Sequence, residues 1–200
     1  MKKILVLCLF YSAIASCQNT NKDFNITLTK FIKCELPLEF SKIEMEKQNP
    51  LTLTQSDFID LHCSDSIRVH DTNYNYYSYI PNKWLYNNEY SYRTFCKFSV
   101  NNQILGLIYE RSFYPDNIFN ETTEYVLVTF TFNGKFISIL PIGGYYGDDI
   151  SFSSSISKDY LIEINIKNYS KDKKTKQSII EKENRKYKIT NKGKIERLFD

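Results

Sequence analysis

No apolar run in the sequence reaches the length that a membrane-spanning helix needs. The apolar stretch at residues 4–14 would form a helix of about 16 Å, whereas a bilayer core is about 30 Å thick. Lys2 and Lys3 precede this stretch, and small residues follow it. This is the pattern of a secretory signal, so residues 1–16 are predicted to be a signal peptide that is removed on export.

Two cleavage sites fit the end of this leader. Ala13-Ile14-Ala15 permits ordinary cleavage after Ala15, which releases a soluble chain. Ile14-Ala15-Ser16-Cys17 is similar to a bacterial lipobox, in which the thiol of Cys17 takes a diacylglycerol and cleavage follows Ser16. We favour the lipobox, which makes Cys17 a lipidation site and residues 17–23 a polar tether to the membrane.

Histidine is scarce, and metal-binding motifs are missing. His62 and His70 lie near Cys63, but the sequence has no Cys-x-x-Cys and no His-x-x-x-His spacing. The glycine-rich residues 143–149 end in two aspartates, too few for the six to eight oxygens of a calcium site. We therefore expect no metal, no cofactor and no catalytic residue.

The sequence has only 6 Gly and 5 Pro, against 16 Tyr and 14 Phe in 200 residues. An aromatic composition rich in Ile and Thr favours strands, and a hydrophobic period of two begins near residue 74. Turn residues at Asn101-Asn102, Asn133-Gly134 and 191–193 predict hairpins. The expected strand pairs are 93–100 with 103–113, 123–132 with 135–140, and 178–190 with 194–199; residues 160–167 are a further strand.

Two short helices are expected before these strands. Residues 24–34 have apolar side chains near helical spacing, and Thr54-x-x-Asp57 approximates a capping box. The predicted fold class is mostly β (α+β): an antiparallel meander, as a curved sheet or a partly closed barrel, with the two helices at its start. Residues 24–200 are expected to form one domain.

Several segments together resemble those of uncharacterised small lipoproteins of Bacteroidota. They are the lipobox, Leu36-Pro37 after the first helix, EYVLVTFTFNGKFISILPIGG at 124–144 and KYKITNKGKIERL at 186–198. The resemblance implies a location in the bacterial cell envelope and an antiparallel β fold. It brings no catalytic residues.

The five cysteines have different expected roles. Lipidation of Cys17 leaves three cysteines in the domain, enough for one disulfide. Cys96 lies in an alternating strand pattern, which predicts a buried thiol. Cys34 and Cys63 are therefore the expected disulfide pair.

Charge is unevenly distributed along the chain. Residues 17–166 contain 12 basic and 18 acidic side chains, whereas residues 167–200 contain 12 basic and 5 acidic ones. An exported protein is not expected to bind nucleic acid. The basic end suits lipid phosphates or an acidic partner, or, as an alternative, its lysines protect sheet edges from aggregation.

The aromatic run at residues 74–92 is the best binding candidate in the sequence. Tyrosine and tryptophan offer flat apolar faces with a polar group, which suits a sugar ring or a protein partner. Trp84, Tyr86, Tyr76 and Tyr79 are the expected binding surface. The alternative is that these rings pack between helix and sheet.

These features favour a lipid-anchored protein of the cell envelope with a binding or structural role and no enzymatic activity. One alternative is a guard or inhibitor lipoprotein that occupies a toxin or a cell-wall hydrolase. The other alternative is an envelope hydrolase, which requires a cleft joining His62 or His70 to a carboxylate and a nucleophile.

Overall fold

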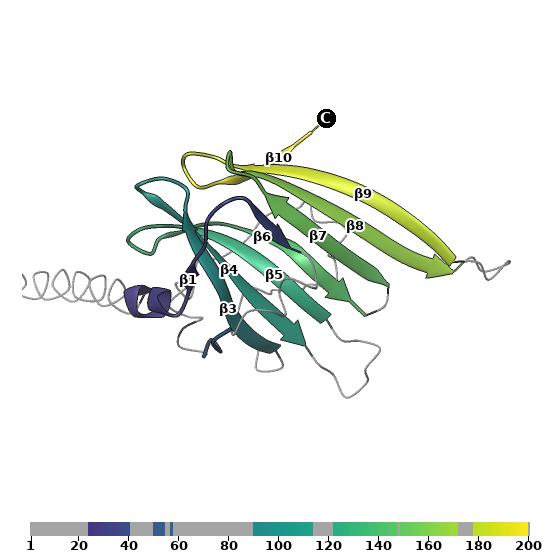
Figure 1. Cartoon of the computed structure of the whole chain (residues 1–200), viewed down its shortest axis with the longest axis horizontal. Helices are drawn as coiled ribbons and strands as arrows, with labels where there is room; N and C mark the ends of the chain where they lie inside the picture. Colours follow the sequence, from purple (N-terminus) through teal and green to yellow (C-terminus); the bar gives the residue numbers. More distant parts are fainter. Residues whose placement is uncertain are drawn as a thin grey trace, which may run out of the picture.

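The computed structural model describes residues 24–40, 50–54, 57, 90–113, 122–147, 149–171 and 178–199. Within them, ten strands form one open, mixed sheet (Figure 1). The strands are β1 (Ile32–Lys33), β2 (Leu38–Phe40), β3 (Tyr90–Ser99), β4 (Ile104–Phe113), β5 (Thr122–Thr131), β6 (Phe136–Tyr146), β7 (Ile150–Ile156), β8 (Leu161–Lys171), β9 (Ser178–Ile189) and β10 (Ile195–Leu198). The mostly β fold class is confirmed.

The strands from β3 to β10 form the predicted meander. They are neighbours in chain order, and every neighbouring pair is antiparallel. Turns lie at Asn101-Asn102, Asn133-Gly134 and 191–193, as the sequence predicts. Gly134 and Gly193 have φ angles of 84° and 82°, a region that glycine adopts without steric cost.

Apolar side chains cover both faces of the sheet. The inner face carries one core, which runs from Ile108 and Leu127 in the middle strands to Ile164 in β8. The outer face of β3 to β6 carries a second core around Val126 and Phe130. The middle of the sheet is therefore buried on both faces, whereas β7 to β9 bury mainly the inner one.

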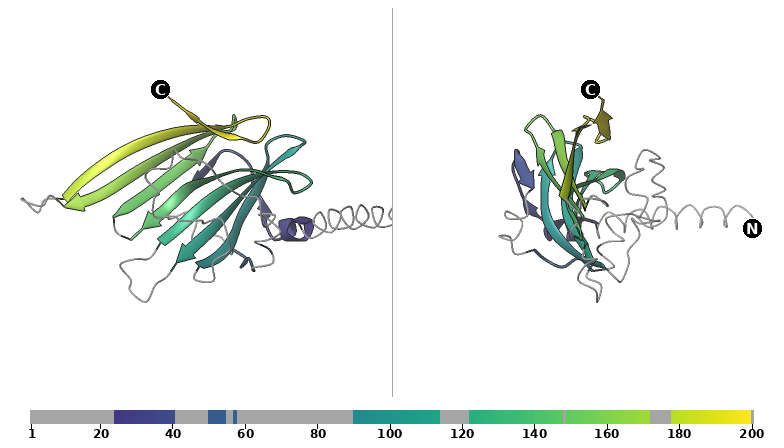
Figure 2. Two further views of the ribbon diagram at one scale, coloured as in Figure 1. Left: turned by 180° about the vertical axis from the view of Figure 1, so that it is seen from behind. Right: turned by 90° about the vertical axis from the view of Figure 1, so that its right-hand side faces the viewer.

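Residues 32–40, which we call the strap, cross the inner face. The strap begins at β1, which pairs with β3 in parallel, and ends at β2, which pairs with β7. Leu36, Leu38 and Phe40 pack into the inner core. Figure 2 shows β2, in purple, to one side of the sheet when the sheet is seen edge-on. The strap thus covers the inner core.

The sheet is curved but not closed (Figure 1), so of the two predicted forms the curved sheet is found and the partly closed barrel is not. β10 pairs only with residues 186–189 of β9, and no strand ladder joins it to β1 or β3. The last turn is instead joined to β5 and to the β3–β4 turn by individual hydrogen bonds. Thr129 Oγ1 donates to the Gly193 carbonyl at 2.6 Å, and Asn101 Nδ2 donates to the Asn191 carbonyl at 2.9 Å.

The described residues contain one helix, at 24–29, where the sequence predicts two. This helix packs Phe24 against Phe130 of the outer core, with ring centroids 5.3 Å apart. It ends earlier than the predicted residue 34, because residues 32 and 33 pair with β3. The second predicted helix lies outside the described residues except for Asp57.

The Thr54–Asp57 capping contact is present. The Asp57 carboxylate accepts a hydrogen bond from the Thr54 backbone at 2.8 Å, and Thr54 Oγ1 accepts one from the Asp57 backbone at 3.4 Å. Lys30 Nζ also donates to Asp57, at 2.6 Å. Burial raises the pKa of Asp57, but the hydrogen bonds from Lys30 and Thr54 outweigh it and hold the pKa below its ordinary value. Asp57 therefore ties this segment to the first helix.

Candidate functional site

All four binding residues predicted from the sequence lie outside the described residues. Trp84, Tyr86, Tyr76 and Tyr79 all belong to this group, as do Cys17 and Cys63. Lipidation of Cys17 and exposure of Trp84 therefore stay predictions.

Cys34 forms a disulfide with Cys96, so the predicted Cys34–Cys63 pair is wrong. The parallel register of β1 on β3 places Ile32 opposite Cys96, and the Cys34 backbone donates to the Lys97 carbonyl at 2.9 Å. The two Cα atoms are 5.9 Å apart, within the range that a disulfide spans. Cys96 is buried as predicted, but it is not a free thiol. The bond fixes the start of the strap to the edge of the meander.

A cluster of buried polar side chains lies where β4 ends and β5 begins. Arg93, Glu110 and Tyr125 are opposite one another on three neighbouring strands. Glu110 accepts hydrogen bonds from Arg93 Nε at 2.9 Å, Ser112 Oγ at 2.8 Å and the Tyr125 hydroxyl at 3.0 Å. Burial, and then the charge of Glu110, raise the pKa of Tyr125, so its hydroxyl stays a donor.

A second carboxylate lies on the next residue pair along the same two strands. Glu124 forms an ion pair with Arg111 and accepts a hydrogen bond from the Tyr146 hydroxyl. The Arg111 guanidinium lies over the Tyr90 ring, 5.1 Å from its centroid. Burial lowers the pKa of Arg111, but the charge of Glu124 outweighs it and raises the pKa, so the arginine stays charged.

This polar cluster is arranged to hold strands together. Each buried carboxylate is bound by one arginine and one tyrosine hydroxyl, which supply charge compensation inside the sheet. Among the described residues, no group of three or more His, Cys, Asp or Glu side chains is placed to hold a metal ion. The cluster explains why polar residues interrupt two buried strands.

The hairpin of β8 and β9 offers a different surface. β7 pairs with β8 as far as Asn168, and the Tyr169 backbone donates to the Asp149 carbonyl at 2.7 Å, so the hairpin extends beyond the neighbouring segment from Ser170 onward. The free end of the hairpin begins at this point. Tyr169 and Ile180 are opposite each other there, with 39% and 52% of their surfaces exposed. Lys167 and Lys182 form the next pair on the same outer face. We call these four residues the tip patch.

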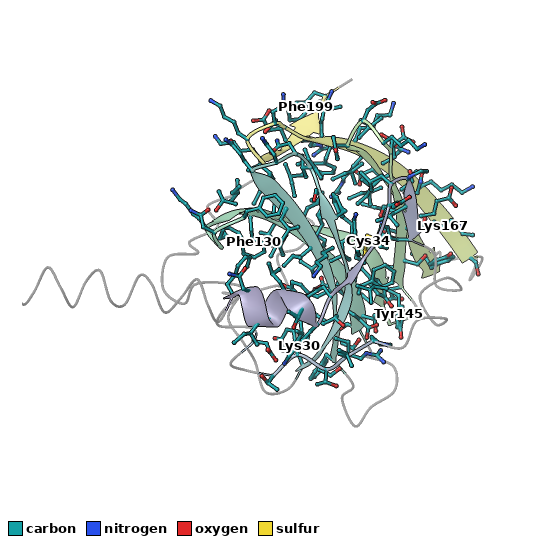
Figure 3. All side chains as sticks on the ribbon, turned by 60° about the vertical axis from the view of Figure 1, so that its left-hand side comes forward. Lys30, Cys34, Phe130, Tyr145, Lys167 and Phe199 are labelled. Atoms are coloured by element: carbon teal, nitrogen blue, oxygen red, sulfur yellow. A yellow bond between two sulfur atoms is a disulfide. The ribbon has the colours of Figure 1, made fainter. Side chains whose placement is uncertain are left out.

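The tip patch lies far from the helix that follows the predicted tether. Figure 1 shows helix 24–29 at one end of the sheet and the free end of the β8–β9 hairpin at the other. Figure 3 shows Lys167 on the opposite side of the molecule from Phe130. The patch combines apolar surface with two like charges that face each other, an arrangement that favours contact with an acidic, partly apolar partner.

The outer edge of β9 adjoins this patch. All of β8 pairs with one edge of β9. On the other edge of β9, β10 covers only the last four residues. No described strand pairs with the other edge between Ser178 and Arg185. On the inner face, Arg185 Nε and Nη2 bind the two carboxylate oxygens of Glu183 at 2.6 and 2.8 Å. The hydrogen bonds from Arg185 lower the pKa of Glu183, although burial opposes them.

Sequence reasoning located this region only in part. The excess of basic residues after residue 167 was a signal, and both protection of a sheet edge and contact with an acidic partner were expected from it. What the sequence did not show is that the hairpin extends past β7 and that β10 is too short to cover β9.

Comparison with known proteins gave no match to a family model, to a curated protein or to a solved structure. No helix in the described part of the chain has both the length and the apolar character needed to cross a bilayer.

Proposed function

We propose that this chain is a lipid-anchored protein of the bacterial cell envelope that acts by binding another molecule rather than by catalysis. The exposed pair Tyr169–Ile180 at the free end of the β8–β9 hairpin carries the binding part of this proposal. Large apolar side chains gathered on a protruding element mark interaction sites on soluble domains. The leader and Cys17 support the anchor.

The two parts fit one arrangement. Cys17 lies seven positions before the start of the helix at 24–29, a distance that an extended chain spans with at most about 25 Å. β9 alone contains 12 residues, about 40 Å of strand. Because the helix and the hairpin tip lie at opposite ends of the sheet, an anchor at Cys17 holds the tip patch away from its own membrane. The patch would then meet partners beyond the lipid surface.

The anchor is tested by mass spectrometry of the native N-terminus. We expect a chain that begins at a diacylglyceryl-modified, acylated Cys17, and Cys17→Ala should move the protein out of the membrane fraction. An unmodified chain that begins at Ser16 contradicts the anchor.

Binding is tested by placing a photo-crosslinking amino acid at Tyr169 in the native envelope. Glu196, which is exposed on β10, is the matched control position. We expect a discrete crosslinked product at Tyr169 and none at Glu196, and Lys182→Glu should reduce the product. Equal labelling at the two positions, or none at Tyr169, contradicts a binding role for the tip.

A further inference from the structure

We propose that the outer edge of β9, from Ser178 to Asn184, accepts an extended segment of another protein as an additional antiparallel strand. This inference rests on the proposed binding function and names its partner class. Exposed sheet edges recruit peptide strands through main-chain hydrogen bonds, and side chains on alternate faces then give specificity. β1 and β10 are the other outermost strands and have two and four residues, so β9 offers the longest open edge among the outermost strands of the described sheet.

The hydrogen bonds at the end of β9 show which of its residues direct their backbone N–H and C=O groups to the open edge. The Ile189 backbone donates to Tyr160 on the β8 side at 3.1 Å, and the Thr190 backbone donates to Lys194 on the β10 side at 2.8 Å. The β8–β9 register has no shift from Leu161 to Lys171. Since alternate residues point to opposite edges of a strand, the even-numbered residues of β9 present their N–H and C=O groups to the open edge.

The side chains along the edge define a complementary partner. On the outer face, Ile180 precedes Lys182; on the inner face, Ile179 precedes Glu181. Lys182 and Glu181 are exposed and form no ion pair within the described part of the chain, and Lys182 faces the like charge of Lys167. A partner strand therefore needs an acidic residue opposite Lys182, a basic residue opposite Glu181 and two apolar residues opposite the isoleucines.

A second copy of the chain is a poor occupant of this edge. In a two-fold antiparallel pairing, the axis is perpendicular to the sheet, so residues of one face meet residues of the same face. An axis at Glu181 or at Glu183 places that glutamate opposite its own copy. An axis at Lys182 pairs Lys182 with itself and Glu181 with Glu183. These three registers bring like charges together. An axis at Ile180 avoids like charges but pairs only Ser178 to Lys182 among the described residues, so occupation of the whole edge favours a different protein as the partner.

The test uses synthetic peptides and the detergent-solubilised protein. Peptide TTEKVV, with acetylated and amidated ends and a fluorophore, places its glutamate opposite Lys182 and its lysine opposite Glu181. Peptide TTKEVV reverses the two charges. We expect TTEKVV to bind about ten-fold more tightly, and the double variant Glu181→Lys with Lys182→Glu to reverse the preference. Equal binding of the two peptides, or no binding of either, overturns the proposal.

Methylation of single peptide amides separates strand addition from other binding. A methyl group on the glutamate nitrogen of TTEKVV, which faces Lys182, should abolish binding, whereas one on the adjacent lysine nitrogen should leave it unchanged. Lys182→Pro removes an edge N–H that the β8 pairing does not use, and Lys182→Thr is its matched control. We expect only the proline variant to lose the peptide completely, with both melting temperatures close to that of the parent.

The crosslinking experiment distinguishes failure of this inference from failure of the proposed function. If the Tyr169 crosslink persists in the Lys182→Pro protein, the chain binds a partner but not by strand addition, and this inference is wrong. If anionic lipid vesicles bind the protein and no peptide does, the inference is also wrong, because the basic pair Lys167 and Lys182 then serves lipid phosphates. Loss of the crosslink in Lys182→Pro but not in Lys182→Thr supports strand addition.

Discussion

Arg111 and Glu124 form the most deeply buried ion pair in the described residues, with side chains 6% and 3% exposed. Each charge depends on the other, because removal of one partner leaves the second charge in a medium of low polarity. Tyr146 and the Tyr90 ring add contacts to the same pair. At the residue scale, the pairing of β4 with β5 is therefore stabilised by two buried charges that must be kept or removed together.

Arg111→Met should destabilise the protein by about 3–5 kcal/mol, because Glu124 stays buried without its cation. The double variant Arg111→Met with Glu124→Gln should recover part of that loss. Urea unfolding of the parent, the single variant and the double variant measures both effects. A double variant less stable than Arg111→Met would show that the pair is not coupled in this way.

The ionisation of Asp57 makes the free energy of unfolding depend on pH. Its pKa is lowered in the folded state, so its contribution is complete above its unfolded pKa of about 3.9 and is lost as the pH falls through the folded value. Asp57→Asn should cost about 1–3 kcal/mol at neutral pH, since buried hydrogen bonds to Lys30 and Thr54 are weakened. The unfolding free energies of parent and variant should converge below about pH 4. A constant difference from pH 7 to pH 2 would contradict this account.

At the scale of elements, the strap and the hairpin turns limit how the sheet curves. The strap is held at one end by the Cys34–Cys96 disulfide and at the other by pairing of β2 with β7. The β5–β6 turn packs closely against the first helix. A Cβ atom added to Gly134 would lie only 2.9 Å from the Phe24 ring. These contacts join segments that are distant in the sequence.

Gly134→Val should destabilise the domain by about 1–3 kcal/mol for two reasons. A β-branched residue resists the positive φ of this turn, and its side chain would collide with Phe24. Asn133→Ser, at the adjacent turn position, is the matched control and should cost less. Thermal unfolding of the two variants checks the order, and an equal effect would contradict the steric argument.

Loss of the Cys34–Cys96 bond should cost about 4 kcal/mol by the chain-entropy estimate for its sequence separation of 62 residues. Paired Cys34→Ser and Cys96→Ser substitutions should lower the urea midpoint accordingly. Cys63→Ser is the control and should leave it unchanged. Peptide mapping without reductant should join the peptide containing Cys34 to the one containing Cys96; a link to Cys63 would contradict the structure.

At the scale of the whole molecule, the helix and the open hairpin lie at opposite ends of one sheet (Figure 1). The strap covers the inner core. The exposed apolar side chains Tyr169 and Ile180 lie near the free end of the β8–β9 hairpin. An envelope protein tethered near its helix would therefore present β8 and β9 outward. Residues 74–89 of the aromatic run lie outside the described residues and stay a separate binding hypothesis, whereas Tyr90 and Tyr92 at its end pack in the outer core.

Trp84→Ala tests that hypothesis. If the run is a recognition surface, the substitution should weaken protein or glycan binding more than it lowers the melting temperature, since binding energy concentrates in a few aromatic residues. Tyr86→Ala is a second variant with a smaller expected effect. A large drop in melting temperature with either variant would assign the run to core packing.

The sequence alone determined the hairpins of this protein, since their signals are local. Asn133-Gly134 fixes a tight turn because its backbone geometry suits few other residues, and alternation in residues 160–167 places Ile162 and Ile164 on one buried face. The capping contact between Thr54 and Asp57 is equally local, because donor and acceptor are three positions apart in the sequence. Turns and caps of this kind are determined by residues that are close together in the sequence.

Only the tertiary structure decided which distant segments meet. Cys34 pairs with Cys96 because β1 adds in parallel to β3, a register that no local pattern encodes. The open sheet, the crossing strap and the uncovered part of β9 depend on strand lengths and curvature across the whole meander. Contacts at such separations are chosen by the sum of packing over the domain, because no single residue carries enough free energy to select them.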